Sequence, residues 1–295
     1  MIRIVIPDGS MQDVITNLLA KAGLPVMIEK KRTKEGRVVA VGWIKSIVFQ
    51  RPQEIPVYLN SNCFDVAFVG EDWIANWGYK FPVLLKLPIG RSGNKPVKII
   101  LAVSQDSGIN QVEELPNDCE VATEYVQLVQ SFFADRGRND IRIVPSFGNT
   151  EHKIRFGATA IIDVTESGES LRENGLKVIY EIMESSTVIV ANPESLADES
   201  KRPFINCFVQ LINGAHQASR YVMLIANVPN KVIEKASHII GGLKGPSCSP
   251  IKGGKGWFAL QSAIKKEDEI NIIFDLLQIG VTDIIVKRDI PLIMT

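Results

Sequence analysis

The chain has 295 residues, which is long enough for two or three domains of ordinary size. Hydrophobic residues make up 45% of it and charged residues 22%, as is usual for a soluble globular protein. Because 33 basic residues balance 33 acidic ones, the composition excludes a global field that would draw the chain to nucleic acid or to an anionic membrane.

The cysteines and histidines predict neither a disulfide framework nor a structural zinc site. The four cysteines lie far apart without a CxxC pair, and the three histidines share no metal-ligand spacing. The first residues, IRIVIP, read as a strand and lack the features of a signal peptide, and no apolar run reaches the length of about 18 residues that spans a bilayer. We therefore expect a cytoplasmic protein with no membrane partner.

Short apolar strands alternate with amphipathic helices over the first two thirds of the chain, which predicts an α/β architecture with mainly parallel sheets. The expected strands are 2–7, 38–44, 45–50, 64–70, 83–90, 97–104, 119–125, 141–146, 157–162 and 186–192. The expected helices are 11–23, 53–62, 110–115, 126–137 and a helix-like run at 171–183, followed by a long helix at 205–220.

The last 75 residues or so follow a different pattern. Strands at 221–228, 246–252, 256–266 and 281–293 enclose helices at 230–240 and 267–280. The order β-α-β-β-α-β predicts a ferredoxin-like module.

The segment DVTESGESLRENG, residues 163–175, joins a buried strand to a helix start through acids and small hydroxyl residues. Backbone N–H groups of such a turn can bind an anion, Gly168 permits close approach, and Ser167 and Ser170 add hydroxyl donors. Asp163 or Glu166 could accept hydrogen bonds from ribose or orient magnesium. The alternative is a capping box, in which Ser167 or Ser170 caps the helix and Glu173 completes the box.

Three other residues end predicted strands or begin predicted helices, where open α/β sheets bind ligands. Asp72, after the strand at 64–70, is either a ligand contact or a helix cap. We interpret Arg51 as a member of a local salt bridge. Tyr125 is either a base-stacking residue or a half-buried core aromatic. The basic run at 29–37 has no interleaved aromatics, so we interpret it as a solvated turn and exclude nucleic acid as a partner.

Taken in order, these motifs resemble ATP phosphoribosyltransferase of the long form, the first enzyme of histidine biosynthesis. The resemblance extends over nearly the whole chain and is carried by the segments IPDGSMQ, RPQEIPVYLNSNCFDVAFVGEDWI, VATEY, GNTEHK, AIIDVTESGESL and PSCSP. It implies a two-lobed catalytic core similar to periplasmic binding proteins and a C-terminal regulatory domain. The implied domains are lobe I at 1–95 and 187–215, lobe II at 96–186, and the regulatory ferredoxin-like domain at 216–295.

The resemblance implies an enzyme, a pentosyltransferase that moves phosphoribosyl from phosphoribosyl pyrophosphate (PRPP) to N1 of ATP and releases pyrophosphate. Mg²⁺ is the implied cofactor, bound to the pyrophosphate, with no protein metal ligand specified. Histidine is the implied feedback inhibitor, and the implied assembly is a homo-oligomer, dimers forming hexamers. The alternatives are a catalytically weak paralogue that acts as a regulatory or ligand-binding subunit, and a small-molecule receptor on the same fold.

By matching motifs, the resemblance also implies site residues. Asp163 and Glu166 are the implied catalytic acids, and Asn227 and Ser247 the implied histidine contacts, unless the third domain serves assembly alone. The implied ATP contacts are Arg51, Gly70, Asp72 and Tyr125. The implied PRPP contacts are Thr165, Glu166, Ser167, Gly168, Glu169, Ser170 and Leu171.

The chain departs from the family at three positions. Asp8 replaces a lysine of the opening loop, near the expected pyrophosphate, and Arg91 or Lys95 are candidates for the missing positive charge. Thr159 replaces a common aspartate, and Glu169 adds an acid inside the phosphate loop.

Overall fold

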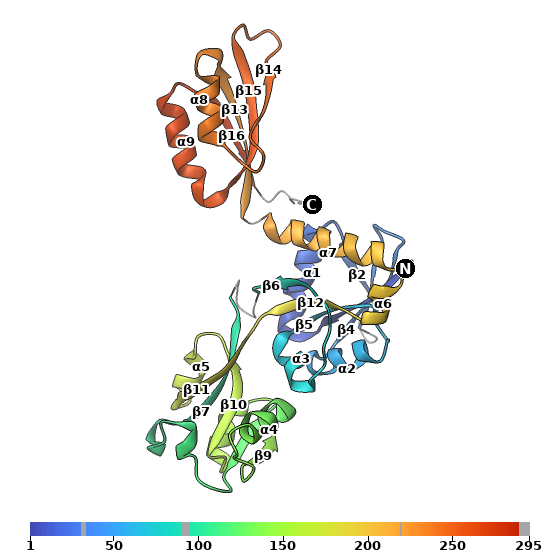
Figure 1. Cartoon of the computed structure of the whole chain (residues 1–295), viewed down its shortest axis with the longest axis vertical. Helices are drawn as coiled ribbons and strands as arrows, with labels where there is room; N and C mark the ends of the chain where they lie inside the picture. The colour runs from blue at the N-terminus through green and yellow to red at the C-terminus, as the bar shows by residue number, and fades with distance from the viewer. Residues whose placement is uncertain (31–33, 90–94, 219, 289–295) are drawn as a thin grey trace. The chain divides into compact units, whose positions relative to one another are not determined.

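A computed structural model describes residues 1–30, 34–89, 95–218 and 220–288 of the chain (Figure 1). Its contacts divide the chain into two compact units, residues 1–16 with 26–206 and residues 17–25 with 207–295. Within the described residues, no helix combines the length and apolar character needed to cross a membrane.

The first unit contains two sheets, and we call the one built from the N-terminal strands sheet I. Its strand order is β2-β3-β4-β1-β5-β12-β6, in which β1 pairs in parallel with both β4 and β5 and the other pairs are antiparallel. The strands are β1 (Ile2–Pro7), β2 (Val26–Lys30), β3 (Glu35–Val38), β4 (Ile44–Gln50), β5 (Val66–Gly70), β6 (Val83–Leu87) and β12 (Thr187–Ala191). Helices α2 (Ile55–Asn60) and α3 (Glu71–Trp77) pack against β5.

Sheet II, the other sheet of this unit, has the order β11-β7-β10-β8-β9 and is drawn green to yellow in Figure 1. Its strands are β7 (Val97–Ser104), β8 (Glu120–Thr123), β9 (Arg142–Pro145), β10 (Ala160–Thr165) and β11 (Leu176–Ser185). Helix α4 (Val126–Ala134) supplies Phe132 and Phe133 to the core on one face, and α5 (Glu169–Glu173) buries Leu171 against the other face. Strands β8, β9 and β10 are parallel, whereas β7 is antiparallel to both β10 and β11.

The chain passes from sheet I to sheet II and back again. It leaves sheet I after β6, continues in sheet II from β7 to β11, and re-enters sheet I at β12, where Thr187 follows Ser185 after one residue. The short helix α6 (Pro193–Ala197) and the long helix α7 (Arg202–Gln217) follow, and α1 (Gln12–Lys21) lies near the N-terminus of the chain.

Three predictions about secondary structure were wrong. The sheets are mixed and not mainly parallel, because the antiparallel strands β7, β11, β12 and β6 join them. The predicted helix at 171–183 is a helix only to Glu173, since Gly175 takes a φ of +69° that ends it, and β11 follows. The strand predicted at 38–44 instead ends at Val38 and is followed by a turn, and β2 was not predicted at all.

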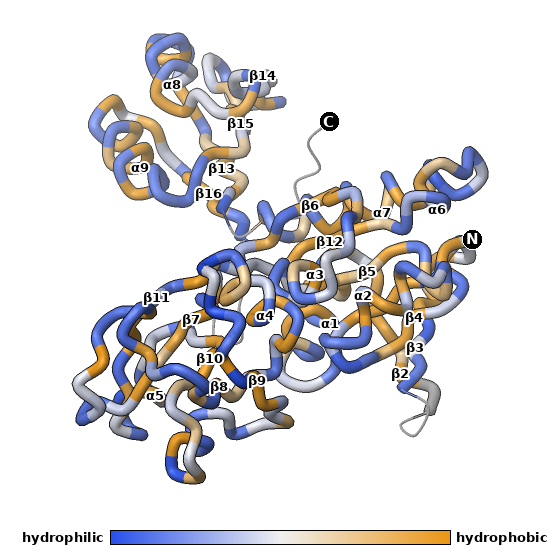
Figure 2. Tube along the Cα trace, turned by 60° about the horizontal axis from the view of Figure 1, so that its bottom comes forward, coloured by the Kyte–Doolittle hydropathy of each residue, from blue (hydrophilic) through white to orange (hydrophobic). Residues whose placement is uncertain are grey.

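The C-terminal module confirms the predicted βαββαβ order, since β13 (Tyr221–Pro229), α8 (Ile233–Ile240), β14 (Ser247–Pro250), β15 (Trp257–Lys265), α9 (Glu269–Gln278) and β16 (Thr282–Lys287) follow one another. The sheet order is β14-β15-β13-β16. Both helices alternate hydrophobic and hydrophilic residues (Figure 2). Their apolar sides cover one face of the sheet, where Leu224, Leu260 and Leu276 are fully buried.

Candidate active site

Six parallel strands of the first unit end in loops that carry the predicted site residues. In sheet I, Asp8 follows β1, Arg51 follows β4, and Asp72 lies just beyond Gly70 at the end of β5. Because parallel neighbours end at one edge of a sheet, these three side chains share an edge, which is where open α/β sheets bind ligands. In sheet II, the loops after β8, β9 and β10 share an edge in the same way, and they carry Tyr125, the segment at 166–168 and Phe147, which was not predicted as a site residue.

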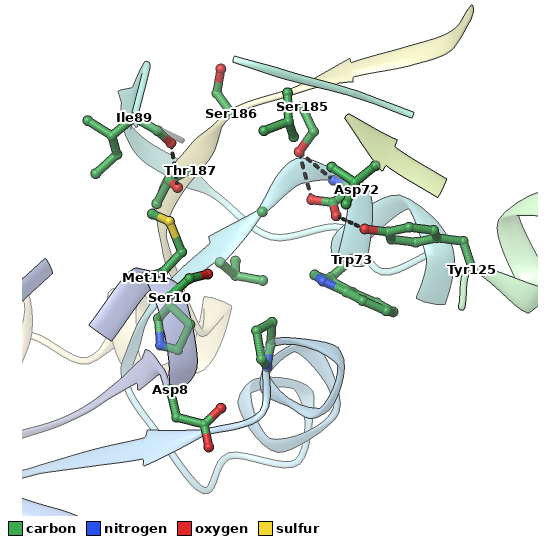
Figure 3. Close-up of a pocket in the computed structure, with 16 residues that line it drawn as sticks. Asp8, Ser10, Met11, Asp72, Trp73, Ile89, Tyr125, Ser185, Ser186 and Thr187 are labelled. Atoms are coloured by element: carbon green, nitrogen blue, oxygen red, sulfur yellow. Dashed lines mark hydrogen bonds between the residues drawn. The ribbon is translucent and has the colours of Figure 1, made fainter. Parts of the chain in front are cut away.

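The centre of the site is a buried hydrogen-bond network around Asp72 (Figure 3). The Ser185 hydroxyl donates to Oδ1 of Asp72 at 2.6 Å, and the Tyr125 hydroxyl donates to Oδ2 at 2.7 Å. The Asp72 N–H donates back to Ser185 Oγ at 3.1 Å. Asp72 and Tyr125 are only 5% and 3% exposed. The network therefore joins α3 beside sheet I to the ends of β8 and β11 in sheet II.

Tyr125 acts here as a neutral donor. Burial raises the pKa of its hydroxyl well above the usual value, and the charge and hydrogen bond of Asp72 raise that pKa further. Its ring lies 4.4 Å from the Trp73 ring, centroid to centroid. The interpretation of Tyr125 as half-buried was therefore wrong, because the side chain lies inside the core.

Residue 70 must be glycine because its Cα lies too close to this network to leave room for a Cβ atom. A Cβ atom at residue 70 would lie 2.0 Å from Oδ1 of Asp72 and 3.5 Å from Oγ of Ser185. Since the backbone φ of −74° suits any residue, the restriction is purely steric.

Two adjoining hollows open at this edge. A pocket of about 100 Å³ is lined by residues from both sheets, among them Asp8, Asp72, Tyr125, Val164 and Ser185. A groove of about 530 Å³ shares Asp8, Ser10, Pro52 and Trp73 with the pocket. It is further lined by Gly9, Arg51, Gln53, Thr123, Glu124, Val126, Pro145, Ser146, Phe147 and Gly148.

Asp8 lies in both hollows with cations beside it. It is 8% exposed, it forms an ion pair with Lys34, and its Oδ2 lies 3.9 Å from Nε of Arg51. Its Oδ1 is buried and has no hydrogen-bond partner among the described residues. Arg51 thus pairs with Asp8, and the basic run that we interpreted as a solvated turn contributes Lys34 to the site. Of the two cations expected there, Arg91 lies outside the described residues and Lys95 forms no described ion pair with Asp8.

The phosphate-loop segment is a tight turn held by its own hydroxyls. The Gly168 N–H donates to Thr165 Oγ1 at 2.9 Å, and the Glu169 N–H donates to Ser167 Oγ at 3.3 Å. Gly168 has a φ of +71° and is the N-cap of α5, without a side-chain cap. Neither Ser167 nor Ser170 is the N-cap residue, so the alternative interpretation of the turn as a capping box was wrong. The Ser170 hydroxyl donates to Oε1 of Glu151 at 3.1 Å, and Asp163 accepts from the Val164 N–H at 2.7 Å.

The structure thus brings Asp72, Tyr125 and Gly70 together around one pocket, with Arg51 in the adjoining groove and Val164, at the start of the phosphate loop, in the pocket wall. Thr165 to Leu171 line neither hollow. Sequence reasoning missed Ser185 and Lys34. No local motif marks Ser185, which lies 113 residues from Asp72, and Lys34 was hidden in a run of surface charges.

In the C-terminal module, Asn227 and Ser247 lie on the open face of the sheet, opposite α8 and α9. Asn227 pairs with Ala259 across β13 and β15, and Ser247 pairs with Gln261 across β14 and β15, so the two side chains are offset by two residues along β15. The Asn227 amide donates to Oδ2 of Asp283 at 3.0 Å.

The described residues contain no group of three or more His, Cys, Asp or Glu side chains that could hold a metal ion. A Mg²⁺ ion bound to substrate phosphates needs only one or two protein carboxylates, however. The donor set of the site, with Asp8 Oδ1 lacking a partner, is compatible with that mode of binding.

Comparisons with known proteins identify the family. The sequence profile of ATP phosphoribosyltransferase matches residues 51–214, and the profile of its C-terminal domain matches residues 218–288. The ATP phosphoribosyltransferase of Prosthecochloris aestuarii is 31% identical over 280 residues, which cover 95% of this chain and 93% of the relative. That of Ignicoccus hospitalis is 30% identical over 98% of this chain and 100% of the relative.

A solved structure supports the fold independently. A chain of the ATP phosphoribosyl transferase (HisG:HisZ) complex from Thermotoga maritima is similar at a TM-score of 0.62 and 24% identity, covering 72% of this chain and 99% of that one. With both profiles matched and relatives aligned nearly end to end, this chain belongs to the ATP phosphoribosyltransferase family, the pentosyltransferases of the first step of histidine biosynthesis.

Proposed function

We propose that the pocket around Asp72 and the adjoining groove are where this chain transfers phosphoribosyl from PRPP to N1 of ATP. The observation that carries the proposal is the convergence of the segments after five strands of two sheets, β1, β4, β5, β8 and β9, on one pair of hollows. Residues of the ATP set (Gly70, Asp72, Tyr125) line the pocket, and Val164 connects it to the phosphate loop.

In this proposal Ser167, Gly168 and Ser170 bind the 5-phosphate of PRPP, assisted by Thr165, Glu169 and Leu171 as parts of the turn. The turn is already shaped by internal hydrogen bonds, so less conformational entropy is lost when phosphate binds. The Ser170 hydroxyl, which donates to Glu151, turns to donate to the phosphate when PRPP binds. Asp163 and Glu166 lie toward the ribose, where negative charge stabilises the oxocarbenium-like transition state.

Lys34 and Arg51 supply the cations that the opening loop lacks. With Asp8 between them, the three side chains carry a net charge of +1, two positive charges less one negative. We propose that Arg51 contacts ATP phosphate and that Mg²⁺, held chiefly by pyrophosphate, supplies the remaining neutralisation of the leaving group. Catalysis then depends on positioning and electrostatics and needs no covalent intermediate.

Sheet membership supports the proposed domain division. Strand β6 belongs to sheet I and β7 to sheet II, and β11 and β12 differ in the same way, in keeping with lobe I at 1–95 and 187–215 and lobe II at 96–186. For residues 216–295 we propose a regulatory domain that binds histidine through Asn227 and Ser247 in a homo-oligomer of dimers or hexamers. Because its substrates are metabolites of the cytoplasm, we also place the enzyme there.

One assay tests the reaction. Purified protein is mixed with ATP, PRPP and Mg²⁺, and phosphoribosyl-ATP is followed by its ultraviolet absorbance while pyrophosphatase removes pyrophosphate. Absence of product would refute the proposal and favour the second candidate, a catalytically weak regulatory paralogue, for which the acidic Asp8 in place of a lysine is the supporting observation.

Two substitutions of glycine by valine, one in the phosphate loop and one outside it, test the role of the loop. Gly168→Val should abolish PRPP binding, because residue 168 has a φ of +71° and its Cβ would lie 3.2 Å from Nη1 of Arg172. Gly137→Val is the matched control, since Gly137 has a φ of +69° but follows the C-terminal end of α4, away from the loop. Equal loss of PRPP binding in both variants would show that strain alone is responsible.

A further inference from the structure

The groove beside the Asp72 pocket has the size and lining of a nucleotide site. Its volume of about 530 Å³ falls within the range of roughly 300–1,000 Å³ typical of small-molecule sites. One wall comes from the ends of β1 and β4, including Arg51 and Gln53, and the other from the ends of β8 and β9, including Phe147. A cation therefore lies across the groove from an aromatic ring.

Phe147 is 96% exposed, the most exposed large hydrophobic side chain among the described residues. The loop that carries it is held on both sides. Before it, the buried Ser146 accepts a hydrogen bond from the Thr150 hydroxyl at 3.0 Å, and after it Gly148 and Asn149 take φ values of +112° and +49°. The loop therefore holds the ring at the groove, without burying it in the core.

The other aromatic residues at this edge are not available for stacking. Tyr125 is 3% exposed and its hydroxyl is bonded to Asp72, so its ring cannot stack on a base without disrupting the network. Trp73 is 8% exposed and its ring lies against Tyr125 (Figure 3). Only Phe147, of the aromatic residues that line the described groove, presents an open face.

We propose that Phe147 is the residue on which the adenine base of ATP stacks. The inference rests on the proposed function and assigns base recognition to the loop after β9, in place of Tyr125. Arg51, whose side chain is 68% exposed, faces the phosphates, and the exposed Gln53 presents an amide that can donate to and accept from the edge of the base. Phe147 supplies affinity through its π-face and the polar neighbours supply discrimination between bases.

Phe147→Ala tests the proposal by equilibrium titration with ATP, measured by calorimetry. Loss of one base–aromatic stack should weaken the Kd for ATP by about 10-fold. The Kd for inorganic triphosphate, which has no base, should not change. Phe147→Tyr should retain the affinity for ATP, because it keeps the ring. In turnover assays, Phe147→Ala should raise the KM for ATP and leave the KM for PRPP unchanged.

Phe156→Ala is the matched control, since Phe156 is 82% exposed but lines neither hollow. The proposal is overturned if Phe147→Ala binds ATP as the wild type does. It is also overturned if the affinities of Phe147→Ala for ATP and for triphosphate fall by the same factor. If the wild type forms product and Phe147→Ala has an unchanged Kd and KM for ATP, this inference alone is refuted. A wild type that binds ATP through Phe147 but yields no product refutes the proposed reaction and leaves the stacking assignment standing.

Discussion

We expect Gly70→Ala to disrupt the hydrogen-bond network around Asp72 and thereby to destabilise the fold. The added methyl group would lie 2.0 Å from Oδ1 of Asp72, whereas real contacts of a Cβ atom lie beyond about 3.0 Å. The carboxylate must therefore move by about 1 Å, which breaks or bends its 2.6 Å hydrogen bond from Ser185 and strains its 2.7 Å bond from Tyr125. Hydrogen bonds to a buried charge contribute about 1.5–3 kcal/mol each, so we expect a loss of about 2–4 kcal/mol in the free energy of unfolding.

The assay is urea unfolding followed by tryptophan fluorescence, to which Trp73 beside Tyr125 contributes. Gly42→Ala is the matched control, because nothing lies within 4 Å of its added Cβ and its φ lies outside the left-handed region. This control should be neutral or slightly stabilising, since alanine restricts the unfolded chain.

A second background isolates the cause. In an Asp72→Ala protein, residue 72 has no carboxylate with which the added methyl group could clash. Gly70→Ala should then lower the free energy of unfolding by less than about 0.5 kcal/mol. A Gly70→Ala protein as stable as the wild type, or an equal loss in both backgrounds, would show that the network around Asp72 does not restrict residue 70.

Three further predictions concern other parts of the chain. Burial alone would raise the pKa of Asp65, but hydrogen bonds from Arg3, Ser195 and Lys201 lower it below the usual value, so its contribution to stability is present at neutral pH and lost in acid. Asp65→Asn should therefore cost about 3 kcal/mol at pH 7 and flatten the acid side of a urea stability profile. Asp140→Asn, in a half-buried pair with Arg138, should cost less; an Asp65→Asn profile identical to that of the wild type would contradict the first expectation. Tyr125→Phe should lower the free energy of unfolding by about 2 kcal/mol, because Asp72 Oδ2 stays buried without its donor. Alkaline titration followed by ultraviolet difference absorbance should show that Tyr125 ionises at a higher pH than ordinary tyrosines. Normal ionisation of all five tyrosines in the folded chain would refute the raised pKa. Ser247→Phe should relieve the proposed histidine inhibition without lowering the uninhibited rate, and inhibition that persists would remove Ser247 from the proposed histidine site.

The sequence could predict the features that depend on local pattern. The βαββαβ order of the C-terminal module followed from hydrophobic periodicity, and the strand ends that carry Asp8, Arg51 and Asp72 followed from apolar runs that stop at polar residues. The strand β11 was missed because apolar residues at Leu176, Ile179 and Met183 also fit a helical spacing. Pairing with β7, a long-range property, decides between the two.

The contacts of the site could not be predicted in the same way. Lys34 comes from a run in which every position except Gly36 is polar, so only the fold selects the side chain that reaches Asp8. Ser185 lies at the last residue of a strand that periodicity misassigned, and its partner is far away along the chain. Tyr125 was found by motif, but its burial depends on the packing of Trp73 and α4, which one sequence does not specify.

The position of Ser185 has a consequence for motion. It lies at the very residue where the chain leaves sheet II for sheet I, so the linker on which the two sheets would pivot also carries one arm of the Asp72 network. A separation that moves Asp72 away from both of its partners breaks the hydrogen bonds from Ser185 and Tyr125 together. At about 1.5–3 kcal/mol each, these bonds restrict a separated form to on the order of one molecule in a hundred or fewer. A ligand that requires such a form binds more weakly by the same factor.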